Sequence, residues 1–357
     1  MQLAIPTRTV GATANVSQGR ADWIDAAKGI GILLVVFGHV VGGLRDAGLL
    51  PQDSEFSTLF YLVYTFHMPM FFLLSGVFVE RRLAKSRADF LHSTLGRIAW
   101  PYFLWSSIQL AVINALGTLV NTPAAFDIAS YVDLIWRPVS QFWYLHILFL
   151  FLIASYLIVP HFGAKALLVA SLFVYSLQEL YGFAYPLSHL CRFFPFYALG
   201  VLMGSDLVRA QASNARAPLI AAGAAAIWLV CAYGARAAGY GYWSDGAVPA
   251  AIAGTVAWLA LANAPQVACQ RILLLLGRCS LAIYVLHVLF VAGTRIVMHK
   301  LFVHRPTLDN PSPGDACRCR GTIVGAHAGQ PAEFGETARA RLSLLENTRP
   351  RKRARER

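Results

Sequence analysis

Long, predominantly apolar runs separated by short polar segments recur along most of the chain. The runs occupy residues 29–44, 57–79, 98–120, 139–159, 166–180, 193–204, 218–235, 247–264 and 279–299. A helix that crosses a bilayer needs about 20 apolar residues, whereas outer-membrane strands alternate apolar and polar residues. The pattern therefore predicts an all-α, polytopic integral membrane helix bundle with about nine transmembrane helices. The first and sixth runs are short, so we expect their helices to extend into the flanking polar residues.

Composition agrees with a membrane protein and divides the chain into two parts. Hydrophobic types make up 57% of the 357 residues and charged types only 13%, which excludes an ordinary water-soluble domain. We expect residues 1–303 to form the membrane-embedded domain. Residues 304–357 carry 11 Lys or Arg against 6 Asp or Glu and are rich in Pro and Gly. This composition predicts a basic, disordered tail, which we interpret as a frameshifted or truncated end.

Basic residues indicate the orientation of the helices. Alternate loops hold 13 Lys and Arg on one side and four on the other, namely Arg45, Arg137, Arg192 and Arg236. Because positive loops stay in the cytoplasm, we predict a cytoplasmic N-terminus in the inner (plasma) membrane. The net charge of +12 lies in loops and in the tail, with no basic aromatic surface, so we expect the bilayer and no nucleic acid as a partner.

The first run contains two ionisable groups, Lys28 and His39. Eleven helical steps amount to three turns plus about 20°, so both side chains project from one helix face about 16 Å apart along the axis. Lys28 would lie at the cytoplasmic boundary. His39 would lie near the middle of the membrane, where an ionisable group is a functional-site hypothesis by default.

His67 lies about ten residues into the second run, at a similar depth. We expect it to meet His39 between adjacent antiparallel helices, and we expect Pro69 to free a backbone carbonyl facing a cavity. A single buried histidine is often only a hydrogen-bonding residue between helices, but two at one depth favour function. His146 and His287 are weaker candidates, which we interpret as structural.

These residues resemble the membrane-bound acyltransferase 3 family, in particular its branch of fucose 4-O-acetylases and nodulation or exopolysaccharide O-acetyltransferases. The resemblance spans Asp22 to Val297. Its most specific parts are Lys28-x10-His39 and Phe66-His67-Met68-Pro69 with Ser75-Gly76; weaker parts are Leu199-Gly200 and Tyr284-Val-Leu-His287. Three features depart from the family pattern: Lys28 replaces the commoner Arg, Thr94 interrupts an Arg-x-x-Arg pattern ending at Arg97, and a tenth helix is missing.

The resemblance implies an enzyme that moves an acyl group, usually acetyl, from cytosolic acetyl-CoA to a hydroxyl of a cell-surface or lipid-linked sugar. Acetyl-CoA or another acyl-CoA would be a co-substrate, with no permanently bound cofactor and no metal. We expect His39 and His67 to be catalytic, His39 as the general base.

Binding residues can be proposed for both substrates. Lys28, Asp25 and Arg97 would bind the donor, with Asp25 one turn before Lys28 and able to pair with it. Trp143 and Arg192 would bind the carbohydrate acceptor, because aromatic faces and guanidinium groups suit a sugar ring.

Two alternatives remain open from the sequence. The chain could be an exporter or flippase of lipid-linked glycans with His39 and His67 as substrate contacts, although no Asp or Glu lies within the central part of any run, which disfavours an ion-coupled carrier. It could also be an inactive truncated remnant.

Overall fold

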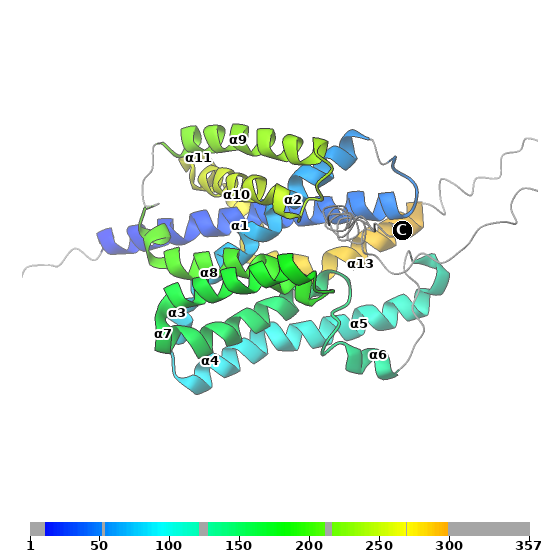
Figure 1. The fold of residues 1–357 in the computed structure, drawn as a ribbon, viewed down its shortest axis with the longest axis horizontal. Coiled ribbons are helices and arrows are strands. Elements are labelled where there is room, and N and C mark those ends of the chain that lie inside the picture. Colours follow the sequence, from blue (N-terminus) through cyan, green and yellow to red (C-terminus); the bar gives the residue numbers. More distant parts are fainter. Residues whose placement is uncertain (1–10, 52–53, 121–127, 211–215, 269, 299–357) are drawn as a thin grey trace, which may run out of the picture. The chain divides into compact units, whose positions relative to one another are not determined.

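The structure is a computed structural model that describes residues 11–51, 54–120, 128–210, 216–268 and 270–298. Its described residues form helices and no strands (Figure 1). The predicted tail, 304–357, lies outside the described residues. The longer helices are α1 (Gly11–Asp46), α2 (Glu55–Gly76), α5 (Trp100–Leu116), α7 (Trp143–Tyr181), α8 (Leu187–Ala210), α9 (Ala217–Ala237), α10 (Val248–Asn263) and α13 (Ser280–Met298). The shorter ones are α3 (Val79–Leu83), α4 (Arg87–Thr94), α6 (Ile128–Asp133), α11 (Pro265–Ala268) and α12 (Arg271–Arg278).

Among the described residues, seven helical segments are long and apolar enough to cross a membrane. They are Asp22–Asp46, Glu55–Leu83, Ser140–Tyr181, Leu187–Gly204, Ala217–Ala237, Asp245–Asn263 and Ser280–Met298. The prediction of an all-α, polytopic membrane protein is thereby confirmed. As expected, the first and sixth apolar runs lie in helices, α1 and α8, that extend well beyond them.

The segment Ser140–Tyr181 is two helices rather than one. Gly163 has φ 79° and ψ 170°, which is not helical. A straight helix of 42 residues would be about 63 Å long, yet the Tyr185 hydroxyl donates a hydrogen bond to the Pro138 carbonyl at 3.0 Å. The chain therefore reverses at Gly163, and the two halves correspond to the predicted runs 139–159 and 166–180.

Gly163 leads to a prediction about stability. Its backbone angles suit glycine and are strained for other residues, so Gly163→Ala should lower the free energy of unfolding by about 1–3 kcal/mol. The measurement is a thermal or denaturant unfolding curve in detergent. Gly234→Ala is the control, because a methyl group there meets nothing within 4 Å. Equal stability of the two variants would contradict the prediction.

The predicted run 98–120 corresponds to α5, which is continuous with α4 through the π-helix η1 (Leu95–Ala99). Side-chain hydrogen bonds hold the first turn and the middle of α5 against residues 134 and 141. The Gln109 and Gln141 amides bond to each other, with Gln141 Nε2 donating to Gln109 Oε1 at 2.8 Å, and the Tyr102 hydroxyl donates to the Leu134 carbonyl. Each of the nine predicted runs thus lies mainly in a described helix.

Helix α2 is the innermost of the candidate spans. It packs against α1, α8, α9 and α10, and 78% of its most apolar window is buried, against 11% for α13. Helix α13 packs along α1 (Figure 1). This arrangement brings side chains of α1, α2 and α13 together inside the bundle.

Candidate active site

Three histidines from three helices lie inside the bundle: His39 on α1, His67 on α2 and His287 on α13. The ring centroids of His39 and His287 are 4.7 Å apart, with an interplanar angle of 64°. His67 lies on α2, which packs against α1. His67 and His287 are 3% and 4% exposed, whereas His39 is only partly buried.

This arrangement includes a contact that the sequence did not predict. The ring that packs against His39 is His287, which we interpreted as structural, while the His67 ring packs against Tyr64 with centroids 4.6 Å apart. The reason is the packing of α13 along α1, which a helix-by-helix assessment of depth does not include.

Hydrogen bonds define the protonation of two of the rings. His67 Nδ1 lies 2.9 Å from the Val63 carbonyl, and His287 Nδ1 lies 2.7 Å from the Tyr284 carbonyl. A carbonyl oxygen only accepts, so each Nδ1 carries the proton and each Nε2 carries a lone pair. Nε2 of His287 is buried and has no hydrogen-bond partner among the described residues, so this ring keeps a free proton acceptor.

Aromatic residues surround the imidazoles. Tyr64 lies over Gly38, where an added Cβ would be 2.5 Å from the tyrosine ring; a larger residue before His39 would therefore displace Tyr64. The Tyr144 and Ser75 hydroxyls are 2.8 Å apart, and the Tyr144 ring packs against Tyr284 at 5.7 Å. The imidazoles and nearby hydroxyls together can accept, hold and donate a proton.

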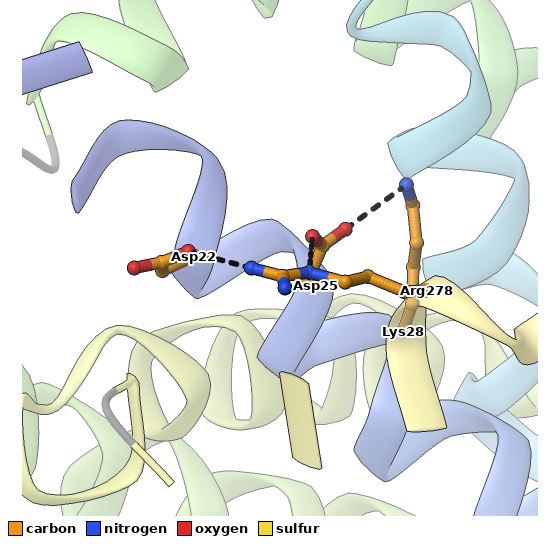
Figure 2. Close-up of polar contacts among 4 residues, drawn as sticks. All are labelled: Asp22, Asp25, Lys28 and Arg278. Atoms are coloured by element: carbon orange, nitrogen blue, oxygen red, sulfur yellow. Dashed lines mark hydrogen bonds and ion pairs between the residues drawn. The ribbon is translucent and has the colours of Figure 1, made fainter. Parts of the chain in front are cut away.

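A charged cluster joins α1 to α12 (Figure 2). Lys28 Nζ lies 3.7 Å from one oxygen of Asp25, and Arg278 Nε lies 3.4 Å from the other. Arg278 also reaches Asp22, with its Nη2 atom 3.5 Å from Oδ1. The ion pair of Lys28 with Asp25 is the one that the spacing suggested, and Arg278 was not foreseen. Such exposed pairs contribute about 0–1 kcal/mol each.

Lys28 and His39 lie on the same unbroken helix, so the sequence-based spacing of about 16 Å along the axis holds. Arg97, the third proposed donor residue, is exposed in η1. It lies near Arg82, and no described polar contact joins it to Lys28 or Asp25.

Trp143 and Arg192, the proposed acceptor residues, meet at Trp243 in the segment between α9 and α10. The Trp143 and Trp243 rings are 5.6 Å apart. An Arg192 guanidinium nitrogen donates to the Trp243 carbonyl, and another lies 3.6 Å from Glu179 Oε1. The sequence of this segment shows only an aromatic run, Tyr240-Gly-Tyr242-Trp243. That run does not predict a contact with Trp143 or Arg192.

A pocket lies beside Arg192, lined also by Thr65, Pro69, Tyr175 and Trp243. Pro69 thus borders a small pocket whose lining does not include His39 or His67. Residues 65 and 69 share one face of α2, but residue 67 is turned about 160° away, so the pocket and the His67 ring lie on different faces of α2. Trp243 lines the pocket, and its Nε1 donates to the Tyr64 carbonyl at 3.0 Å. Because the Tyr64 ring packs on His67, Trp243 connects the pocket to the His67 side of α2.

Among the side chains that the structure describes, no group of three His, Cys, Asp or Glu could hold a metal ion. The candidate site therefore consists of the three imidazoles, the hydroxyls near them and the charged cluster at one end of α1.

Comparisons with known proteins identify one family and one relative. A family model described as an acyltransferase domain matches residues 21–311. Nodulation protein NolL of Sinorhizobium fredii (strain NBRC 101917 / NGR234) is 27% identical over 215 residues, which cover 57% of this chain and 54% of that protein. The chain thus spans about half the length of this curated relative. No solved structure matches the chain significantly.

Proposed function

Because the chain belongs to the acyltransferase 3 family, we propose that it is a membrane O-acyltransferase that moves acetyl from cytosolic acetyl-CoA to a hydroxyl of a cell-surface or lipid-linked sugar. The family match over residues 21–311 confirms the resemblance noted in the sequence. The observation that carries the proposal is the contact of the His39 and His287 imidazoles inside a multi-pass helix bundle, since acyl transfer needs a proton acceptor beside the reacting hydroxyl.

His39 is the proposed general base. It would remove the proton of the acceptor hydroxyl while the hydroxyl oxygen attacks the thioester carbonyl, and the departing thiolate would take up a proton. His39 suits this role because it is the partly accessible member of the imidazole group. His67, with its Nδ1 proton engaged by Val63, would offer Nε2 as a second acceptor.

The donor would approach from the end of α1 that carries Lys28. The Lys28 ammonium would bind a phosphate of coenzyme A, and Asp25 would hold it in place. Arg97 would act as a separate contact, because it is exposed and its guanidinium can form paired hydrogen bonds with phosphate. The excess of basic loops on this side supports a cytoplasmic N-terminus and an inner-membrane location.

The acceptor would approach from the opposite side of the bundle. Trp143 and Arg192 support this placement because both contact Trp243, whose indole N–H donates to the Tyr64 carbonyl and whose ring stacks on that of Tyr64. An aromatic wall with a guanidinium suits the C–H faces and hydroxyls of a sugar ring.

The test uses the whole chain in membrane vesicles with radiolabelled acetyl-CoA and a panel of methyl glycosides that includes methyl fucoside. We expect release of coenzyme A together with label in the glycoside. An exporter or flippase would produce neither, and an inactive remnant would turn over rapidly in cells. Absence of both products from stable, folded protein would overturn the proposal.

Lys28 provides a separate prediction. Lys28→Ala should raise KM for acetyl-CoA about tenfold or more, a loss of at least ~1.4 kcal/mol, because one charged phosphate contact is removed. Lys28→Arg keeps the charge and should remain close to the wild type. The measurement is the initial rate of coenzyme A release against acetyl-CoA concentration, with Lys85→Ala, an exposed lysine, as control. An unchanged KM in Lys28→Ala would exclude the donor role.

A further inference from the structure

We infer that His287 and His39 form a proton-sharing pair, in which Nε2 of His287 holds the proton that His39 passes on during acyl transfer. His287 is thus a positioning residue that acts through His39. The inference rests on the proposed acyl transfer, and it assigns a role to a residue that the sequence alone indicated to be structural.

The protonation of the His287 ring leaves Nε2 able to accept a proton. Its Nδ1 proton is engaged by the Tyr284 carbonyl at 2.7 Å, which leaves the lone pair on Nε2. That atom is buried and has no hydrogen-bond partner among the described residues, although an unsatisfied buried acceptor destabilises a folded protein. Buried polar atoms are nearly always paired in folded proteins, so this atom requires an explanation that packing does not supply.

His39 is placed to give a proton to His287. Its ring is the neighbour of His287, with centroids 4.7 Å apart in an edge-to-face arrangement. Among the described hydrogen bonds none involves the His39 ring, so the imidazole can turn about its side-chain torsions to direct one nitrogen at Nε2 of His287. His67 does not compete for this position, since its ring packs on Tyr64.

The proton transfers leave both imidazoles unchanged at the end of the reaction. As the acceptor oxygen bonds to the thioester carbon, its proton passes to one nitrogen of His39, and the proton on the other nitrogen moves to Nε2 of His287. When the C–S bond breaks, the thiolate takes the first proton from His39, and His287 returns the second. One proton has then moved from the hydroxyl to the thiol, and both imidazoles are neutral again.

The test uses a variant that removes Nε2 of His287 but keeps a donor for the hydrogen bond that Nδ1 makes. Asparagine can place its amide N–H near the position of Nδ1 but has no group at Nε2. We therefore expect His287→Asn to keep its folded amount and unfolding midpoint near those of the wild type, while kcat falls at least about tenfold and KM for acetyl-CoA changes less than about twofold. In His287→Ala, added imidazole should restore part of the lost rate.

The assay uses the full chain in vesicles, radiolabelled acetyl-CoA and the methyl glycoside panel, with coenzyme A release as a second readout. His146→Gln is the matched control, because glutamine can replace the bond of His146 Nε2 to the Ile135 carbonyl. Full activity of His287→Asn would overturn the inference. So would a loss of activity that only follows a loss of folded protein, without rescue by imidazole. An inactive wild type would instead contradict the proposed function itself.

Discussion

Replacing His39 with alanine is expected to lower the rate of acetyl transfer by about 10²- to 10⁴-fold, the usual contribution of a general base. The side chain lies on α1 against His287 and is the partly accessible imidazole of the group. The other two imidazoles are 3% and 4% exposed, and a backbone carbonyl holds each of them through Nδ1, so neither Nε2 is as accessible to the acceptor hydroxyl as the His39 ring. The measurement is the O-acetyl content of surface polysaccharide from cells that produce the variant.

The control for this experiment is His92→Ala. His92 is exposed on α4, so its loss should leave acetylation unchanged. Both variants must be present in the membrane at wild-type amounts for the comparison to hold. Normal acetylation in His39→Ala would remove His39 from the mechanism, and with it the reason for placing the reaction in this part of the bundle.

Much of the fold could be predicted from the sequence because the length of an apolar run is a local property. The runs 139–159 and 166–180 show this well: the six residues between them include His161, Lys165 and Gly163, and the chain reverses at Gly163. The helix ends were less predictable. Helix α5 continues backward through η1 into α4, because polar helix-forming residues extend a helix without any change in apolar content.

The site was only partly predictable, since it depends on which helices become neighbours. Lys28 and Asp25 lie one turn apart on the same helix, so their ion pair follows from spacing alone. Arg278 and His287 reach α1 from near the end of the described chain. No local pattern predicts that α12 and α13 pack on α1. The contacts of Trp243 could not be predicted for the same reason, because they lie on α2, α7 and α8.

The pairs Ser75-Gly76 and Leu199-Gly200 both belong to the motifs that carry the family resemblance, and the structure gives them a physical role. A Cβ at Gly76 would lie 2.2 Å from the Tyr197 carbonyl oxygen, and one at Gly200 would lie 2.0 Å from that of Leu73. The backbones of α2 and α8 therefore touch directly. Small residues permit such close approach between membrane helices, and this contact holds α2, which carries His67, against α8, which carries Arg192.

Gly200→Ala should therefore destabilise the whole bundle. The added methyl group meets backbone atoms of Leu73, which cannot move aside as a flexible side chain would, so α2 and α8 must separate. Overpacking of this kind costs about 1–3 kcal/mol or more. We expect a clearly lower unfolding midpoint in detergent and a fall in activity, because the separation shifts His67 relative to His39.

The matched control is Gly223→Ala on α9, where an added Cβ meets nothing within 4 Å. There the substitution should be neutral or stabilising by up to about 1 kcal/mol, as expected for glycine to alanine within a helix. The two variants add the same methyl group to the same residue type. A difference between them therefore measures the α2–α8 contact, and equal unfolding midpoints would show that the two helices do not meet at Gly200.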